Sequence, residues 1–257
     1  MARVAGAPNM VARTNRILEI LTESGKTEVA DLAAALNVSQ VTMRKDLTEL
    51  EERGLVRREH GAAALLSPDN VEGRLAYHYN EKLRIARRTI ACVHDGDTVM
   101  IENGSCCALL AFELARERTG ITIITNSAFI ADYVRRERGA TCVLLGGTYQ
   151  DDARVCVGPL VAASLADFYV DLLFVGTDGY SNVTGFTNSD QMRAQAVRDM
   201  SAHAKRVVVL TESEKFQKRG TVPLALDPTR TTVVTDAALG DAMETELKSK
   251  GMDVVTV

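Results

Sequence analysis

From Asp97 onward, short runs rich in β-branched and other apolar residues alternate with longer segments of helical periodicity. The runs are TVMIE, ITIIT, TCVLLGG, VDLLFVG, RVVVLT, TTVVT and MDVVTV, and helical stretches such as CCALLAFELARER and SDQMRAQAVRDMSAHA lie between them. Apolar strands that alternate with helices predict a mostly parallel sheet covered on both faces. We therefore expect residues 97–257 to form a Rossmann-like α/β domain.

The first 66 residues follow a different pattern, in which short amphipathic helices succeed one another. Helical spacing of apolar residues predicts a first helix that stops at Ser24-Gly25 and a second helix within EVADLAAALN. Asn37-Val38-Ser39 is typical of a tight turn, and the Ser39 hydroxyl can cap a third helix. The apolar faces expected of the three helices consist of Ile17, Leu18, Ile20, Leu21, Val29, Leu32, Leu36, Val41, Leu47 and Leu50.

The third helix lies within VSQVTMRKDLTELEERG and ends at Gly54. Helix-turn-helix proteins read base edges with the amino-terminal part of the second helix of the motif. That part of the predicted helix carries polar and basic side chains. The residues expected to face DNA are Ser39, Gln40, Thr42, Arg44 and Lys45.

The stretch LVRREHGAA follows and predicts a β wing. Leu55-Val56 has the composition of a short strand, and Gly61 is a turn signal. Between them lie Arg57, Arg58 and His60, which we expect to contact the DNA backbone. Such cations add affinity through counterion release but carry no sequence information.

A three-helix segment with several arginines also fits a packing module or a dimerisation domain. The tight turn, the capped third helix and the basic hairpin together favour binding to double-stranded DNA. The whole chain carries 30 basic and 34 acidic residues, a formal net charge of −4. Residues 1–65 contain equal numbers of both, so the acidic excess lies outside the predicted DNA-binding domain.

The break Ser67-Pro68-Asp69-Asn70 marks the predicted domain boundary. We expect a winged helix-turn-helix domain at residues 1–66, a linker and connecting helix at 67–96, and the α/β domain at 97–257. The connecting helix places Ile85, Ala86, Ile90 and Val93 on one face.

Polar and glycine-rich loops follow the predicted parallel strands, where ligands of α/β proteins bind. Glycine lets the backbone approach an anion, and a helix amino terminus offers free N–H groups to a phosphate. Lys215 follows another strand and is a candidate point charge for the same anion. Each loop alone is also compatible with an ordinary turn. The candidate loop residues are Asn103, Gly104, Ser105, Thr125, Asn126, Ser127, Gly146, Gly147, Gly176, Thr177, Asp178 and Gly179.

The stretch VADLAAALNVSQVTMRKDLTELEERGLVRREHGAA resembles the winged helix-turn-helix of the DeoR family of bacterial transcription regulators. It departs from the family pattern at Ala62, where a second glycine is usual. The positions that match the family signature are Val38, Ser39, Thr42, Arg44, Lys45, Asp46, Leu47, Leu50, Glu51, Gly54, Arg58, His60 and Gly61.

The α/β part is similar to the DeoR sensor domain, whose fold is shared with ribose-5-phosphate isomerases and glucosamine-6-phosphate deaminases. The family's acidic strand-end loop falls on residues 102–106, so the resemblance adds Glu102 and Cys106 to the candidate effector residues. Here Glu102 replaces a shorter Asp and Cys106 replaces a hydroxyl residue. Gln195 stands where the family often has Glu. The resemblance spans roughly residues 13 to 220.

We expect a transcription regulator, a repressor of carbohydrate or related metabolic genes, that responds to a phosphorylated sugar or related metabolite. The alternative is a sugar-phosphate isomerase or deaminase-like enzyme, for which Asp178, Glu102 and Lys215 are the candidate acids and bases. With a DNA-binding head the pocket is expected to bind without turnover, and we assign no catalytic residue. A homo-oligomer, dimer or tetramer, is expected because helix-turn-helix proteins read paired half-sites.

Cysteine content and hydropathy indicate the cellular compartment. The five cysteines are odd in number and show no CxxC spacing, so neither a disulfide framework nor a metal site is expected, and no cofactor is implied. Cys106-Cys107 fits either a redox sensor or a buried pair. No apolar run approaches the ~20 residues of a membrane span. A cytoplasmic protein with no membrane partner is the expectation.

Overall fold

The computed structural model describes residues 10–52, 55–65, 71–135 and 137–257. The chain divides into two compact units, Met1–Asn80 and Glu81–Val257. The predicted linker 67–96 is thus shared between them. The predicted helix end at Gly54 and the predicted break at Ser67–Asn70 lie outside the described residues.

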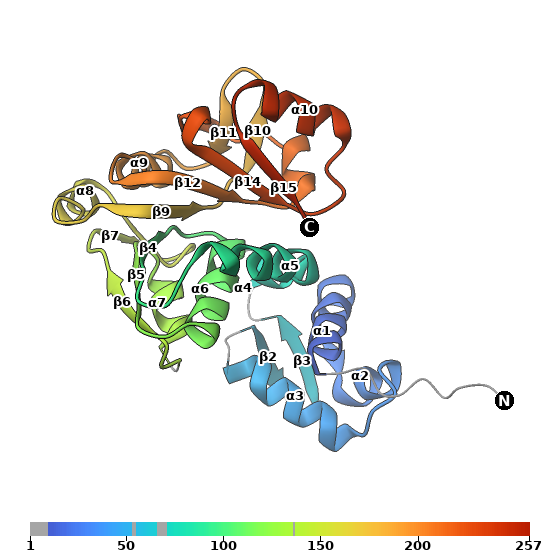
Figure 1. The fold of residues 1–257 in the computed structure, drawn as a ribbon. Coiled ribbons are helices and arrows are strands. Elements are labelled where there is room, and N and C mark those ends of the chain that lie inside the picture. Colours follow the sequence, from blue (N-terminus) through green and yellow to red (C-terminus); the bar gives the residue numbers. More distant parts are fainter. Residues whose placement is uncertain (1–9, 53–54, 66–70, 136) are drawn as a thin grey trace. The chain divides into compact units, whose positions relative to one another are not determined.

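The amino-terminal unit has the expected helices and wing (Figure 1). Its three-stranded sheet has the order β1-β3-β2, with β3 antiparallel to both neighbours. Helix α1 ends at Ser24, as Ser24-Gly25 predicts, and Gly25 follows with φ 68°. Its elements are α1 (Met10–Ser24), β1 (Thr27–Glu28), α2 (Val29–Ala35), α3 (Gln40–Glu52), β2 (Val56–Glu59), β3 (Ala62–Leu65) and α4 (Val71–Ala76).

One core prediction for this unit is wrong. Val41 was expected to face inward, but its side chain is 74% exposed. The buried stripe of α3 runs instead through Met43, Leu47 and Leu50, at helical spacings of four and three residues. Val41 lies outside that stripe, because the helix begins at Gln40 and turns it toward solvent.

The carboxyl-terminal unit is built on a seven-stranded parallel sheet with the order β15-β14-β12-β9-β4-β5-β6. All seven predicted strands of the α/β domain belong to this sheet, so the predicted fold class is confirmed. The strands are β4 (Thr98–Ile101), β5 (Ile121–Thr125), β6 (Ala140–Leu144), β9 (Val170–Val175), β12 (Ala204–Leu210), β14 (Thr231–Thr235) and β15 (Asp253–Thr256).

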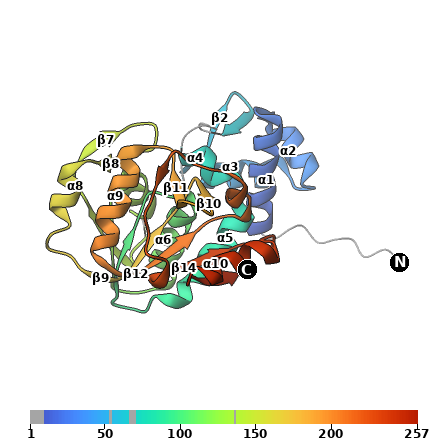
Figure 2. The same ribbon diagram turned by 90° about the horizontal axis from the view of Figure 1, so that it is seen from above.

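Helices cover both faces of this sheet. The chain moves from β4 toward β6 in one direction and from β9 toward β15 in the other. Right-handed crossovers therefore place α6 and α7 on one face and α9 and α10 on the other (Figure 1). Figure 2 shows α8 beside α9. The helices are α5 (Tyr79–Thr89), α6 (Ser105–Glu117), α7 (Ala128–Val134), α8 (Pro159–Ser164), α9 (Gln191–Ala202) and α10 (Asp241–Ser249), with 3-10 turns at Ile90–Cys92, Ser213–Gln217 and Pro228–Arg230.

Two small antiparallel elements were not predicted. A hairpin pairs β7 with β8, and a three-stranded sheet has the order β10-β11-β13. These strands are only two to four residues long, too short for a periodicity of two to be visible in the sequence. They are β7 (Thr148–Gln150), β8 (Val155–Val157), β10 (Gly179–Ser181), β11 (Gly185–Asn188) and β13 (Val222–Pro223).

Helix α6 lies in the interior, since every residue from Cys106 to Ala115 is buried. Glu113, which pairs with Arg87 at 3.0 Å, is the one charged residue of this span, and a helix that is otherwise apolar around its circumference is buried on all sides. Within the part of the chain that is described, no helix is long and apolar enough to cross a membrane.

Removing the ring of Phe174 is expected to destabilise the sheet. Phe174 is fully buried in the central strand β9, and Phe→Ala changes in cores cost about 3–5 kcal/mol. The control is Tyr169→Ala, because that side chain, one residue before the strand, is 71% exposed. Urea unfolding should show a large loss of stability for Phe174→Ala and a change of about 0.5 kcal/mol or less for Tyr169→Ala. Equal losses would contradict this description of the core.

Candidate DNA-binding surface and effector site

The amino-terminal end of α3 has the geometry of a base-reading helix. Ser39 caps it, because its Oγ accepts a hydrogen bond from the Thr42 backbone N–H at 3.1 Å. Arg44 donates to Gln40 Oε1 at 3.1 Å, one helical turn away. Gln40, Arg44 and Lys45 are exposed. The five predicted DNA-facing residues therefore lie at the start of one helix, with Ser39 as its cap and the other four in its amino-terminal half.

A buried ion pair fixes the inward side of this helix. Asp46, only 6% exposed, follows Lys45 and accepts a hydrogen bond from Arg13 Nη2 at 2.9 Å and a second from its Nε. The hydrogen bond that Arg13 donates to Asp46 raises the pKa of Arg13 above its ordinary value. This two-point contact joins α1 to α3 and sets the rotation of the helix that presents Arg44 and Lys45.

The wing is a tight hairpin. Glu59 pairs with Ala62 across β2 and β3, so His60 and Gly61 alone form the turn. Their φ angles, 42° and 91°, are both positive, as a type I′ hairpin requires. Exposed His60 thus lies at the tip, whereas Ala62, at which the chain departs from the DeoR pattern, is a buried strand residue.

The two wing arginines differ in their contacts. Arg58 Nε donates to Glu51 Oε2 at 2.7 Å and Nη1 to Thr48 Oγ1 at 3.0 Å, which ties β2 to α3. Arg57 forms an exposed ion pair with Glu59 at 3.1 Å. Exposed pairs of this kind are weak and are readily exchanged for a phosphate, so Arg57 is the more available cation.

In the carboxyl-terminal unit the predicted loops after β4 and β9 meet at the point where the sheet order reverses. Ligands of open α/β sheets bind at such a switch point. Glu102, at the end of β4, is buried, and its Oε2 accepts a hydrogen bond from Gly176 N at 3.1 Å. A Cβ on Gly104 would lie 3.2 Å from Gly176 Cα, so glycine permits the close approach of the two loops.

The loops after β4 and β5 also meet. Ser127 Oγ donates to Asn103 Oδ1 at 3.0 Å and accepts from Ile130 N, which caps α7. Thr125 Oγ1 accepts from Ser127 N at 3.0 Å. Asn126 is 1% exposed and donates to the Cys156 carbonyl, while its Oδ1 has no hydrogen-bond partner among the described residues. A buried acceptor without a partner is costly, and a ligand donor would relieve that cost.

Two of the predicted glycine loops have packing roles. A Cβ on Gly147 would lie 2.7 Å from the Val157 carbonyl oxygen, and one on Gly179 would lie 2.3 Å from the Lys218 carbonyl oxygen. Glycine is therefore needed at both positions for backbone to approach backbone. Gly146 is exposed, and a Cβ there would meet nothing within 4 Å.

Lys82 is a residue of this site that the sequence interpretation missed. It lies on α5, is 2% exposed, and forms an ion pair with Glu212 at 3.0 Å. Removing one partner of a buried pair leaves an uncompensated charge, at a cost of about 3–5 kcal/mol. Its spacing of three and four residues from Ile85 and Ala86, on the predicted apolar face, was the available signal.

Glu212 also connects the end of β12 to the start of α6. Cys106 Sγ lies 3.6 Å from Glu212 Oε2 and donates to it. Burial and the Glu212 charge raise the pKa of Cys106 well above its ordinary value, and burial and the Glu102 charge do the same for Cys107. A reactive thiol needs a lowered pKa, so this pair is the buried alternative rather than the redox sensor.

Lys215 follows Glu212 in the 3-10 turn Ser213–Gln217, and its backbone N–H donates to the Glu212 carbonyl. Its ammonium group makes no hydrogen bond or ion pair with the described residues. Lys215 lies three residues after Glu212, and Glu212 contacts Cys106 in the first turn of α6.

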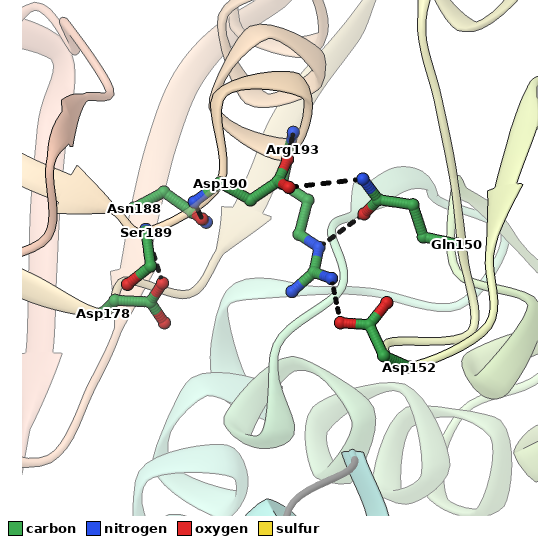
Figure 3. Close-up of polar contacts among 7 residues, drawn as sticks. All are labelled: Gln150, Asp152, Asp178, Asn188, Ser189, Asp190 and Arg193. Carbon is green, nitrogen blue, oxygen red and sulfur yellow. Dashed lines mark hydrogen bonds and ion pairs between the residues drawn. The ribbon is translucent and has the colours of Figure 1, made fainter.

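A second polar cluster was also missed (Figure 3). Arg193 Nε donates to Gln150 Oε1 at 2.7 Å, and Nη2 donates to Asp152 Oδ2. Asp190 caps α9 by accepting from Arg193 N at 2.8 Å. The cluster joins the β7–β8 hairpin to the start of α9. Residues forty positions apart form it, so only the tertiary fold brings them together.

Asp178 lies on the other side of the α9 start in the same view (Figure 3). Its Oδ2 accepts a hydrogen bond from Ser189 N at 2.8 Å, and Ser189 directly precedes Asp190. Asp178 is half-buried at the end of β9. Among the residues that the structure describes, no group of three or more His, Cys, Asp or Glu side chains is arranged to hold a metal ion.

Comparison with known proteins decides between regulator and enzyme. Residues 13–69 match the DeoR-like helix-turn-helix domain, and residues 77–237 match the DeoR C-terminal sensor domain. The chain belongs to the DeoR family. Members of this family are transcription regulators, and this DeoR-family chain is a DNA-binding regulator and not an enzyme.

Two curated relatives cover most of the chain. The putative aga operon transcriptional repressor of Escherichia coli O157:H7 is 27% identical over 95% of this chain and 93% of the relative. The HTH-type transcriptional repressor GlcR of Bacillus subtilis (strain 168) is 30% identical over 78% of each chain. The structure of ribose 5-phosphate isomerase A from Methanocaldococcus jannaschii is similar with a TM-score of 0.39 and 19% identity over 54% of each chain, from which nothing about function follows.

For the DeoR head, replacement of Arg44 with Ala is expected to weaken operator binding by about 1–3 kcal/mol and to change base preference. Arg57→Ala should weaken binding to all sequences alike and lower the salt slope by about one unit, because Arg57 is expected to contact phosphate. Fluorescence anisotropy with specific and scrambled duplexes at several salt concentrations measures both effects. Wild-type affinity in both variants would contradict the assigned surface.

For the sensor domain, Gly179→Ala is expected to lower stability by about 1–3 kcal/mol, because the added methyl group would overlap the Lys218 carbonyl oxygen. Gly146→Ala is the matched control and should change stability by about 0.5 kcal/mol or less. Urea unfolding of both variants provides the comparison. A stable Gly179→Ala protein would show that this loop is not held by backbone packing.

Proposed function

We propose that this DeoR-family chain represses carbohydrate or related metabolic genes and is controlled by a phosphorylated sugar or related metabolite. The two relatives named above are described as transcriptional repressors, which supports the sign of regulation. Regulators of this family act on DNA, which in bacteria lies in the cytoplasm, and this supports action in the cytoplasm. The observation that carries the effector half is that the loops after β4, β5, β9 and β12 contact one another at the carboxyl ends of the strands.

The phosphate end of the effector is assigned to the amino terminus of α6 and to Lys215. Gly104 is the N-cap residue and offers no side chain, so no side-chain cap occupies the first N–H groups of this 13-residue helix. Lys215 supplies a cation with no acidic partner among the described side chains. The Cys106–Glu212 contact holds the start of the Lys215 turn against the start of α6.

The remaining predicted effector residues are assigned to the rest of the ligand. Asn126 offers a buried acceptor, and Asn103 and Ser127 line the adjoining loop. Asp178 is assigned to ligand hydroxyl groups, because a carboxylate readily accepts hydrogen bonds from hydroxyls. Glu102 is already engaged with Gly176, so its proposed role is to hold the two loops at the distance the ligand requires.

On the DNA side, Gln40, Thr42, Arg44 and Lys45 are assigned to base edges and adjacent phosphates, and Ser39 to the helix start. Arg57, Arg58 and His60 are assigned to the backbone beside the wing. We propose a homo-oligomer, dimer or tetramer, because two heads are needed for paired half-sites. A ligand that binds one conformation of the regulator better shifts the population that is competent for DNA, typically by about 5–150-fold.

The test separates the two halves of this proposal. Lys215→Ala should bind operator DNA as the wild type does but lose its response to the effector, because it keeps the head and loses the anion-binding cation. Arg44→Ala should lose DNA affinity but bind the effector normally. Calorimetry with a panel of sugar phosphates and their unphosphorylated sugars, followed by DNA binding with each active compound, measures both.

The controls are built into the panel. Unphosphorylated sugars should bind much more weakly, since the α6 amino terminus and Lys215 have no anion to contact. If no phosphorylated compound binds, or if Lys215→Ala responds as the wild type does, the effector assignment is wrong. If the wild-type chain fails to bind every promoter fragment at low salt, the repressor assignment is wrong.

A further inference from the structure

Strand β6 is an edge of the seven-stranded sheet and pairs only with β5. The other edge is β15. On β6, Thr141 is exposed and the Leu144 side chain is 46% exposed, although both belong to a strand of a central sheet. An edge strand offers a row of backbone donors and acceptors to any strand that can reach it.

The register shows which backbone groups of β6 face outward. Ile121 N donates to the Gly139 carbonyl, and Leu145 N donates to the Thr125 carbonyl, so odd-numbered residues of this segment point their backbone groups toward β5. Backbone groups alternate in direction along a strand. The N–H and C=O groups of Ala140, Cys142 and Leu144 therefore point away from the sheet, and they make no hydrogen bond within the described chain.

Nothing in β6 blocks another strand. Natural edge strands are usually protected by charged side chains, proline or a bulge. The sequence Ala140–Leu144 contains no charged residue and no proline, and its pairing with β5 runs without a bulge. Strand β15, at the opposite edge, carries exposed Asp253. The two edges therefore differ: β6 lacks the features that block pairing, whereas β15 carries a charged residue that disfavours it.

We propose that β6 pairs antiparallel with β6 of a second copy of this chain, so that the parallel sheets of two subunits join into one. Two-fold symmetry makes such an interface self-complementary, because the same strand supplies both sides. The proposal specifies an interface for the homo-oligomer invoked in the proposed function, but it rests on the strand geometry and not on DNA or effector binding.

One register uses all three outward-facing residues. With the two-fold axis at Cys142, Cys142 faces Cys142 of the second copy, and Leu144 faces Ala140 of the second copy. Each facing pair then exchanges both of its N–H···O bonds, as hydrogen-bonded antiparallel pairs do. The large Leu144 side chain opposite the small Ala140 gives complementary volumes at both ends of the paired segment.

The first experiment places a charge on each edge of the sheet. In the full-length protein, Leu144→Lys adds an ammonium group to the proposed interface, and Thr256→Lys adds the same group to exposed β15. Sedimentation velocity across protein concentrations should show wild-type self-association for Thr256→Lys and a dimer dissociation constant raised at least about ten-fold for Leu144→Lys. Wild-type association of Leu144→Lys, or a wild-type chain that stays monomeric at micromolar concentrations, overturns the proposal.

The second experiment tests the register. Cys92 is exposed and Cys142 is half-buried, whereas Cys106, Cys107 and Cys156 are buried. In a Cys92→Ser background, a short bifunctional thiol reagent should link two chains through Cys142. The Cys92→Ser/Cys142→Ser protein should give no linked dimer. If a dimeric Cys92→Ser protein gives no Cys142 link, or if the link persists without Cys142, the proposed pairing is wrong.

Failure here is distinguishable from failure of the proposed function. Leu144→Lys leaves Arg44, Lys45 and Lys215 in place, so it should keep the calorimetric response to an effector and bind a single half-site. A dimer that resists Leu144→Lys while these responses persist removes only the β6 interface.

Discussion

The contact between the ends of β4 and β9 is the constraint on which the sensor domain depends. All the strands run in the same direction, but the chain leaves β4 toward β5 and leaves β9 toward β12, so the two loops diverge to opposite sides of this point. Glu102 accepts from the Gly176 backbone N–H, and Gly104 and Gly176 allow the loops to approach within van der Waals contact. Any side chain at either glycine would fill the space between the loops and separate the strand ends that carry the site.

Further polar contacts support this point from both sides. Lys82 and Glu212 bury their charges together, and Glu212 reaches Cys106 at the first turn of α6. Arg193 joins the β7–β8 hairpin to the start of α9, with Asp178 nearby (Figure 3). These charged side chains therefore position loops around the point where the sheet order reverses.

Much of this architecture could be predicted from the sequence because its signals are local. Seven apolar runs became the seven parallel strands, and Ser39 and Ser24-Gly25 marked helix ends through side-chain and backbone preferences that act within a few residues. The roles of Lys82 and Arg193 could not be predicted in the same way, since their partners Glu212 and Gln150 lie far away in the chain. The short antiparallel strands were missed because two to four residues are too few to show a periodicity. Val41 shows a third case, in which a helix rotated by its neighbours exposes a residue that hydrophobicity alone places inside.

The two sides of α3 have separate tasks, and this has an evolutionary consequence. Asp46, Leu47 and Leu50 are buried and hold the helix, whereas Gln40, Arg44 and Lys45 are exposed and take no part in the core. With the outer side assigned to base edges as proposed, substitutions there would retarget a duplicated copy to a new promoter without a loss of folding. The two-residue turn of the wing leaves few positions that can vary. Changes in binding preference among paralogues are therefore expected mainly in the first turns of this helix.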